Sequence, residues 1–216
     1  MTRCNCQSTH KRRRVVLTGG PGAGKTALLE LIRQAFCSHV AVLPEAASII
    51  FGGGFPRHPD QACQRASQEA IYHVQRQLEV IGENHNPAIV LCDRGTLDGL
   101  AYWPGPVEDF WRATGTTRER ELARYDVVIH LRTPSVEHGY NHQNPLRTES
   151  AERASQIDAL IVEAWAGHPR RTMINSSTDF LEKAGRALAL LREELPECCR
   201  GHVVSGLAAR GGGVPV

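Results

Sequence analysis

The feature that most constrains this chain is the octapeptide GGPGAGKT at residues 19–26. It satisfies the pattern G-x-x-x-x-G-K-[ST] of a phosphate-binding loop. A short apolar run, RVVLT at residues 14–18, precedes it, and a helical repeat of apolar residues follows it. A glycine-rich loop between a buried strand and a helix directs successive backbone N–H groups into one concavity. The pattern and its context therefore predict a site for the phosphates of a nucleoside triphosphate.

The residues of this loop have distinct expected roles. Lys25 is expected to reach the β- and γ-phosphates, and the hydroxyl of Thr26 is expected to ligate Mg²⁺. The sequence thus predicts ATP and Mg²⁺ as cofactors. The residues expected to contact the nucleotide are Gly19, Gly20, Pro21, Gly22, Ala23, Gly24, Lys25, Thr26 and Ala27.

The remaining apolar segments predict an α/β fold with a mostly parallel sheet between two layers of helices, because short buried-strand patterns alternate with longer helical periodicities. The expected strands are residues 14–18, 39–43, 88–92, 127–131 and 172–175. Helices are expected after the phosphate loop, at about residues 147–166 and at 178–195. The longest helix signal begins after Asp60, a typical N-cap, and ends near Gly82. Its expected apolar face is Ala62, Ala66, Ala70, Val74, Leu78 and Ile81.

Length and composition suit one domain of this kind. The chain has 216 residues, 41% of them hydrophobic. We expect a disordered basic arm at residues 1–13, a P-loop domain at residues 14–195 and a disordered tail at residues 196–216. No apolar run approaches the roughly 20 residues of a membrane span, and no signal-peptide pattern is present. A cytoplasmic location is therefore expected.

Positive charge is concentrated at the N-terminus. The first 14 residues carry five basic and no acidic side chains, whereas the rest of the chain carries 20 basic and 23 acidic ones. A short basic arm is usually solvated, and this arm lacks the interleaved aromatic residues of nucleic-acid binders. Nucleic acid is therefore not an expected partner. Because arginine provides 22 of the 25 basic residues, a role for any single arginine needs support from its position.

The cysteines favour free thiols. The seven are Cys4, Cys6, Cys37, Cys63, Cys92, Cys198 and Cys199. Their number is odd, and a chain of this length does not need disulfides to fold. Neither Cys4 with Cys6 nor Cys198 with Cys199 has a matching cysteine or histidine pair at the spacing of a structural zinc site. We therefore interpret all seven as free thiols.

Asp93 and Arg94 directly follow the expected strand AIVLC at residues 88–92. Ligands of open α/β sheets gather at this edge. A carboxylate there holds Mg²⁺ directly or through water, and a guanidinium clamps a phosphoryl group or an acceptor. The alternative is a simple strand-ending turn. We predict Asp93 and Thr26 as metal ligands, and Lys25, Asp93 and Arg94 as catalytic residues.

Glu45 follows the second expected strand and has two possible roles. It is a candidate general base for an acceptor hydroxyl. Alternatively, it is a favourable first-turn acid of the short helix AASIIF. The next segment, FGGGFPRHP at residues 51–59, has the composition of a loop that closes over a substrate or of a plain surface connection, with Arg57 as its secondary candidate residue.

Arg147 and Arg153 flank Thr148, a candidate helix N-cap. They are candidates for an arginine-bearing lid, which stabilises the charge on the moving phosphoryl group and excludes water. The alternative is a solvated helix face. His138 and His142 are four positions apart, but the intervening Gly139 disfavours a helix, so we interpret this pair as polar loop residues rather than metal ligands.

The motifs GGPGAGKT, PEAA and LCDRG, in this order, resemble those of small P-loop proteins with AAA-type or ATP/GTP-binding domains, which in turn look like nucleoside and nucleotide kinases. The resemblance covers residues 14–195. It implies a parallel five-stranded sheet with strand order 2-3-1-4-5 and ATP on the phosphate loop. It also implies an acid–arginine pair that faces the acceptor. The matching residues are Asp93 and Arg94 for this pair, Glu45 for the acid after the second strand, and Arg147 and Arg153 for the lid.

One departure from the family leaves the acceptor open. Thymidylate kinases usually have an aromatic residue after the Asp-Arg pair, and deoxynucleoside kinases have Glu-Arg-Ser, whereas this chain has Gly95. The resemblance therefore implies a small nucleoside- or nucleotide-like acceptor without identifying it.

Three functions are compatible with these motifs. The first is a kinase that transfers the γ-phosphoryl group of ATP to a small acceptor. The second is an AAA-like ATPase or nucleotide-dependent switch that acts on a protein partner. That class normally places Glu after the strand-ending Asp to polarise water, and Arg94 stands there instead. The third is a GTP-binding switch, but none of the three lysines lies in the Asn-Lys-x-Asp motif that reads guanine.

Overall fold

The protein contains one five-stranded parallel sheet with the order β2-β3-β1-β4-β5. The computed structural model describes residues 6, 8–84, 86–134, 150–175 and 179–200. The strands are β1 (Arg13–Thr18), β2 (Val40–Leu43), β3 (Ile89–Asp93), β4 (Val127–Leu131) and β5 (Arg171–Ile174). The α/β fold and the strand order are thus as the sequence predicts, and each strand lies within two residues of its expected bounds.

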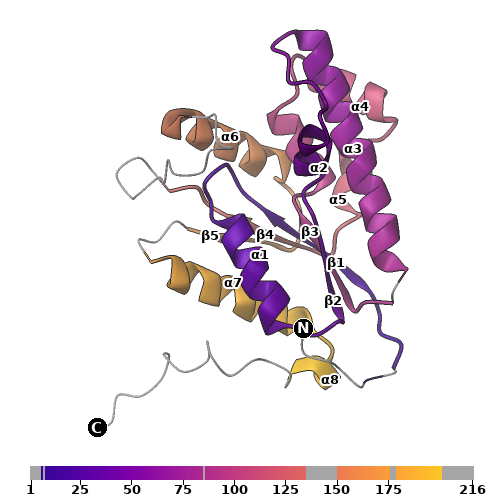
Figure 1. The fold of residues 1–216 in the computed structure, drawn as a ribbon, viewed down its shortest axis with the longest axis vertical. Coiled ribbons are helices and arrows are strands. Elements are labelled where there is room, and N and C mark those ends of the chain that lie inside the picture. The colour runs from indigo at the N-terminus through magenta and orange to yellow at the C-terminus, as the bar shows by residue number, and fades with distance from the viewer. Residues whose placement is uncertain (1–5, 7, 85, 135–149, 176–178, 201–216) are drawn as a thin grey trace.

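Helices cover both faces of this sheet (Figure 1). On one face lie α1 (Lys25–Ala35) and α7 (Phe180–Glu194), and the other face packs against α6 (Ala151–Ala164) and the 3₁₀ helix η1 (Thr96–Ala101). The remaining helices are α2 (Ala46–Gly52), α3 (Gln61–Glu83), α4 (Val107–Thr114), α5 (Arg118–Leu122) and α8 (Glu197–Arg200). The described part of the chain contains no helix that is long and apolar enough to cross a bilayer.

Side chains of β1 alternate between two hydrophobic clusters. Val15 and Leu17 pack with residues of α1 and α7, whereas Val16 packs with residues of α6 and η1. All three are at most 1% exposed. Because β1 is the central strand, both of its faces are buried, and each fully buried aliphatic side chain contributes about 1.5–3 kcal/mol. This packing fixes the strand from which the phosphate loop emerges.

The prediction of which face of α3 is buried is wrong. Asp60 caps the helix as expected, accepting a hydrogen bond from the backbone N–H of Ala62 at 2.9 Å. However, Ile81 is 58% exposed, and the buried positions are Ser67, Tyr72, Gln75, Glu79 and Gly82. Their polar groups are satisfied by hydrogen bonds, such as that from the Tyr125 hydroxyl to Glu79 Oε1 at 2.7 Å. The apolar periodicity of the sequence therefore marks a face other than the one that is buried.

The ordered chain extends beyond the predicted boundary at residue 195. Residues 197–200 form α8, and Cys199 on this helix is 1% exposed. The expected boundary at residue 195 therefore falls before this helix, whose Cys199 belongs to the same hydrophobic cluster as α1 and α7. Residues 201–216, and residues 1–5 and 7 of the N-terminal arm, lie outside the described residues, so the division into arm, domain and tail stays a prediction.

Candidate functional site

The phosphate loop joins β1 to α1 at the carboxyl edge of the sheet. Its backbone has positive φ angles at Gly19 (136°), Gly22 (80°) and Gly24 (93°), a region that side-chain-bearing residues rarely adopt. A Cβ atom on Gly19 would also lie 2.0 Å from the carbonyl oxygen of Leu131. Glycine is thus required for the loop to curve, as the sequence predicts, and α1 begins directly behind it with its N-terminus facing the loop.

Lys25 folds back over this loop. Its Nζ donates hydrogen bonds to the carbonyl oxygens of Gly19 at 2.7 Å and Gly20 at 3.0 Å. Burial, together with the positive charge of Arg94, lowers the pKa of Lys25 to about 8, although the nearby carboxylates partly oppose this shift. The ammonium is therefore desolvated beside the concavity that the backbone N–H groups of residues 19–26 form, which we call the cradle. A polyphosphate bound in the cradle would provide a negatively charged partner for this ammonium.

Asp93 ends β3, beside the strand that carries the loop. Its register partner on β1 is Leu17. The Oδ1 atom of Asp93 is buried without a hydrogen-bond partner among the described residues. Burial raises the pKa of Asp93 to about 6, while the charge of Lys25 opposes the shift. A buried, unsatisfied carboxylate oxygen is costly unless it has a ligand, and oxygen donors are the ligands of Mg²⁺. The residues present thus fit the expected Mg²⁺ ion.

Arg94 is held in a fixed position at the edge of the phosphate loop. Its Nε donates to Glu45 Oε1 at 2.5 Å, and its Nη1 donates to Asp98 Oδ2 at 3.1 Å and to the Gly19 carbonyl at 3.2 Å. Its other terminal nitrogen, Nη2, has no hydrogen bond to any described residue. The backbone of Arg94 has a φ of 69°, a strained value for a side-chain-bearing residue. The surroundings therefore hold Arg94 in an unfavourable conformation and leave one donor group available.

Asp98 is the anchor behind Arg94. It is 3% exposed and accepts hydrogen bonds from Thr18 Oγ1 at 2.7 Å and from Trp165 Nε1 at 2.6 Å. Trp165, just after α6, packs against Gly95, where a Cβ atom would lie 2.6 Å from the indole ring. This contact explains the absence of an aromatic residue after the Asp-Arg pair, because Trp165 already fills that space.

The contact between Gly95 and Trp165 gives a stability prediction. We expect Gly95→Ala to lower the free energy of unfolding by about 1–3 kcal/mol, because it overpacks a buried ring. Gly185→Ala is the matched control: it lies within α7 with nothing near its Cβ position, so it should be neutral or stabilising by up to about 1 kcal/mol. Urea denaturation measures both. If the two variants have the same free energy of unfolding, the Trp165 ring can move away from the added methyl group without loss of stability, and the prediction is wrong.

A second set of contacts, from α6, β4 and α7, holds the loop. Asp158 on α6 accepts hydrogen bonds from the backbone N–H of Gly20 at 2.9 Å and pairs with His130 Nε2 at 2.9 Å. Lys183 on α7 donates to the carbonyl oxygens of Ala23 at 2.9 Å and Arg132 at 2.6 Å. These buried polar contacts fix the backbone whose N–H groups form the cradle.

The structure places the other predicted site residues as follows. Thr26 and Ala27 lie exposed on the first turn of α1, beside the cradle. Arg153 lies on the first turn of α6, where its Nη1 donates to Gln156 at 3.3 Å. Arg147, with Thr148, His138 and His142, lies outside the described residues. The helix N-cap in the described segment is Ser150, which accepts from the backbone N–H of Arg153.

Arg57 lies apart from this cluster. Its guanidinium carbon is 4.2 Å from the centre of the Phe51 ring, so it stacks on the end of α2. The contact is local to the segment at residues 51–59, and the side chain is exposed. The choice between a closing loop and a plain connection stays open.

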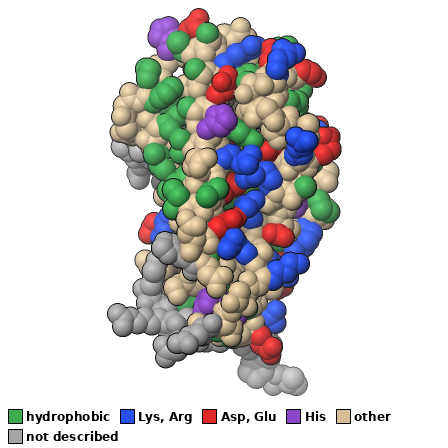
Figure 2. Space-filling view, turned by 90° about the vertical axis from the view of Figure 1, so that its right-hand side faces the viewer, with side chains coloured by type: hydrophobic (Ala, Val, Ile, Leu, Met, Phe, Trp, Pro, Cys, Tyr) green, Lys and Arg blue, Asp and Glu red, His purple; other side chains and the backbone are tan. Residues whose placement is uncertain are grey.

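A cavity of about 490 Å³ opens elsewhere, between α3 and residues 114–124. Two of its three arginines are already paired: Arg76 lies 3.7 Å from Glu121, and Arg124 contacts Glu79. Figure 2 shows the corresponding face, on which basic and acidic side chains interleave. None of the cavity-lining residues belongs to the phosphate loop, so we place the candidate site at the loop, where the chemistry-bearing residues converge.

Sequence reasoning missed Asp98, Asp158 and Lys183. Two of them had a detectable signal. Asp158 lies among the apolar positions Ile157 and Ile161 of a helix, and Lys183 precedes Ala184 on the apolar stripe of another. A charged side chain on an apolar face indicates a buried ion pair or hydrogen-bond network. Asp98 had no such signal, because the short 3₁₀ helix around it has no regular periodicity.

Comparisons with known proteins agree with this geometry. The family model described as an AAA domain matches residues 14–183, which include the phosphate loop, Asp93, Arg94, Asp158 and Lys183. No curated protein matches the chain.

Proposed function

The chain belongs to this AAA domain family, and on that premise we propose that it is an ATP-dependent kinase that transfers the γ-phosphoryl group to a small nucleoside- or nucleotide-like acceptor. The family supports the coarser statement of a nucleotide-binding P-loop protein that hydrolyses or transfers a phosphoryl group. The kinase activity, the acceptor class and the roles of individual residues are our proposal.

The observation that carries the proposal is the fixed position of Arg94. Its guanidinium is tied to Glu45, Asp98 and the loop carbonyl of Gly19, so it need not be ordered when the substrate binds. Phosphoryl transfer passes through a state with charge spread over the moving group, and catalysis consists mainly of positioning and electrostatic stabilisation. A preorganised arginine beside the cradle supplies both.

The surroundings of Glu45 argue against a role as general base. Glu45 accepts hydrogen bonds from Arg94 Nε and from Ser48 Oγ, each at 2.5 Å. Burial alone would raise the pKa of Glu45, but the charge of Arg94 and these hydrogen bonds lower it below its ordinary value. A carboxylate held in this way is a weak general base. We therefore propose that Glu45 orients Arg94 rather than accepting a proton from the acceptor.

The other site residues have separate roles in the proposed reaction. Lys25 neutralises the β- and γ-phosphate oxygens, and the loop N–H groups hold the polyphosphate chain. Thr26 and Asp93 hold Mg²⁺, which neutralises charge on the phosphates when it is bound. Arg153 remains our candidate for a lid arginine, because it lies at the exposed start of α6.

Acceptor-dependent formation of ADP tests the proposal. Purified protein is incubated with Mg·ATP or Mg·GTP, with and without a pooled panel of nucleosides, nucleotides and related metabolites. We expect ADP to form rapidly only when the panel is present, and dividing the panel then identifies the acceptor. Equal rates with and without the panel would contradict a kinase.

The family match is also compatible with a second function, that of an AAA-like ATPase or switch that acts on a protein partner. In that case the protein would bind Mg·ATP tightly and turn it over slowly, whatever small molecules are present. Equilibrium binding of a fluorescent ATP analogue together with the ADP assay separates the two functions, because only the kinase requires an acceptor.

The two perturbed groups at the cradle predict a pH profile. Asp93 must be ionised to hold Mg²⁺, and its pKa is about 6; Lys25 must be protonated to neutralise phosphate, and its pKa is about 8. The value of kcat/KM reports the free protein. We therefore expect kcat/KM to fall below pH about 6 and above pH about 8. Because the two groups interact, the two apparent pKa values describe the pair rather than either residue alone. A flat profile from pH 5 to pH 9 would contradict this assignment.

A further inference from the structure

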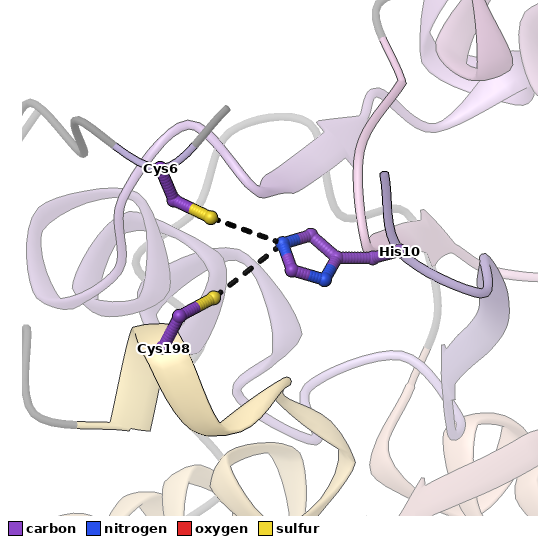
Figure 3. A group of neighbouring side chains, drawn as sticks. All are labelled: Cys6, His10 and Cys198. Atoms are coloured by element: carbon purple, nitrogen blue, oxygen red, sulfur yellow. Dashed lines mark hydrogen bonds between the residues drawn. The ribbon is translucent and has the colours of Figure 1, made fainter. Parts of the chain in front are cut away.

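Distant parts of the chain meet at one histidine. Cys6 and His10 lie in the segment before β1, and Cys198 lies on α8, 188 positions after His10. Figure 3 shows the imidazole directed between the two sulfur atoms. His10 Nε2 is 3.5 Å from Cys6 Sγ and 3.4 Å from Cys198 Sγ. The three potential ligand atoms lie within 4.8 Å of one another.

Two sulfur contacts exceed what this nitrogen can satisfy by hydrogen bonding. A neutral imidazole nitrogen carries either one proton or one lone pair, so it forms one good hydrogen bond. Here the same Nε2 faces two sulfur atoms at nearly equal distances. A cation between the three atoms satisfies all of them at once, because thiolate and imidazole donate electron pairs to it.

The distances also agree with those in a tetrahedral zinc site. Zinc binds sulfur at about 2.3 Å and imidazole nitrogen at about 2.0–2.1 Å, which separates a sulfur and a nitrogen ligand by about 3.5 Å at the tetrahedral angle. The two observed separations are 3.5 and 3.4 Å. Sulfur and nitrogen donors select zinc over magnesium, so this cluster is chemically distinct from the Mg²⁺ site expected at the phosphate loop.

A second cluster lies next to the first but is shut off from solvent. Cys37, His39 and Cys199 are 3%, 8% and 1% exposed, and the two cysteines belong to the hydrophobic core beside α1. The rings of His10 and His39 pack edge to face with their centres 5.0 Å apart. By contrast, Cys198 is exposed and Cys6 is half-buried, so a hydrated ion has access to the first cluster. The buried cluster contacts His10 through the ring of His39.

We propose that Cys6, His10 and Cys198 bind one Zn²⁺ ion, with a solvent water as the fourth ligand, and that this ion fastens the N-terminal segment to α8. Both segments are short, so a metal bridge between them adds to the packing of Cys199 in the core and of His10 against His39. Cys6 and Cys198 are thiols rather than disulfide partners in the structure, as expected from the sequence, and in this proposal they become ligands of the ion. The proposal is independent of phosphoryl transfer.

Cobalt substitution tests this site in the full-length protein. The protein is reduced, stripped with a chelator and titrated with Co²⁺. We expect one tetrahedral Co²⁺ per chain, with visible d–d absorption and a sulfur-to-cobalt charge-transfer band, and stoichiometric displacement by Zn²⁺ but not by Mg²⁺. We also expect removal of Zn²⁺ to lower the midpoint of thermal unfolding, because it releases α8 and the N-terminal segment.

Single substitutions identify the ligands. We expect Cys6→Ser and Cys198→Ser each to weaken Zn²⁺ binding by more than about 100-fold, which exceeds the effect of losing a group that only supports a ligand. Cys63→Ser is the matched control, because Cys63 is an exposed thiol on α3, far from the cluster in the sequence and outside it. Lys25→Ala should bind Co²⁺ like the unaltered protein, which separates this test from the proposed function.

Three results would overturn the proposal. One is the absence of tetrahedral Co²⁺ absorption in the unaltered protein. Another is an unchanged spectrum in Cys6→Ser and Cys198→Ser with its loss in Cys37→Ser, which would place the metal in the buried cluster. The third concerns Cys198 and Cys199, whose sulfur atoms are 3.6 Å apart. If the protein is isolated without reductant and the peptide that contains both residues has lost the mass of two hydrogen atoms, the two cysteines form a disulfide.

Discussion

Replacing Lys25 with alanine is expected to lower kcat/KM for ATP by about 10²–10³-fold, the range typical for removing one preorganised group that stabilises transition-state charge. Lys25 is buried over the cradle and donates to the carbonyls of Gly19 and Gly20. Its side chain is not part of either hydrophobic cluster, so the loss removes charge rather than core packing. Steady-state kinetics of ADP formation measures the effect.

The fold of this variant should remain intact. The pKa of Lys25 is lowered to about 8, mainly by burial, so its charged form is not a source of stability at neutral pH. We expect the midpoint of thermal unfolding to stay within about 4 °C, which corresponds to about 1 kcal/mol or slightly more in a domain of this size. Lys11→Ala, an exposed lysine of the arm, is the matched control and should retain full activity. Full activity of Lys25→Ala would remove the phosphate loop from the mechanism.

Replacing Asp93 with asparagine is expected to lower Mg²⁺-dependent turnover by roughly 10²-fold or more, because several kcal/mol of charge stabilisation depend on the metal that it holds. Part of the loss should return at high Mg²⁺ concentration, since Thr26 remains as a ligand. Measuring turnover against Mg²⁺ concentration checks this. Glu30→Gln, a surface carboxylate on α1, is the control and should have no effect. An unaltered Mg²⁺ dependence in Asp93→Asn would make Asp93 a structural residue.

The same substitution should stabilise the protein. The pKa of Asp93 is raised from 3.8 to about 6, so the folded state holds the proton more tightly than the unfolded state does. Stability is therefore lost as the pH rises from about 4 to about 6, and ionised Asp93 costs about 1–3 kcal/mol at pH 7. Asp93→Asn should unfold at a higher temperature at pH 7, and the difference should vanish below pH about 4. Lower stability at pH 7 would contradict this account.

Asp93→Asn is thus expected to lower activity and raise stability, which means that Asp93 serves function at the expense of stability. Asp93 Oδ1 is buried without a hydrogen bond, and Arg94 has an unfavourable φ of 69°. Both features cost free energy in the protein without its ligands, and such costs concentrate at functional sites. Binding of Mg·ATP is expected to recover part of this free energy.

The sequence predicts the central strands well because β3 and β4, and β1 from Val15 onward, are buried on both faces. Largely apolar runs such as residues 127–131, interrupted only by His130, therefore mark them, and the loop pattern between β1 and α1 fixes the start of the domain. The predicted face of α3 fails for the opposite reason. Its buried side chains Gln75 and Glu79 are polar. Gln75 donates to Glu79, and the other partners of Glu79 include Arg124 and Tyr125, so only the folded chain shows why they are inside.

The candidate site follows the same distinction. Lys25 and Asp93 are identifiable because each directly follows a local pattern, a glycine loop or an apolar strand. The groups that position the site are distant in sequence: Asp158 contacts Gly20 across 138 positions, and Trp165 contacts Asp98 across 67. The contacts of His10 with Cys6 and Cys198 likewise could not be predicted from the spacing of these residues in the sequence. Such contacts depend on how the whole chain folds, which local patterns do not encode.

The fate of the γ-phosphoryl group is the most direct test of the central claim. ATP labelled at the γ-phosphate is incubated with the protein, Mg²⁺ and the acceptor panel, and labelled inorganic phosphate is separated from labelled organic products. We predict that most of the transferred label appears in an organic phosphate, at a rate that falls by about 10²–10³-fold in Lys25→Ala. Label that appears only in inorganic phosphate, at a rate unaffected by the panel, would contradict the claim and indicate an ATPase.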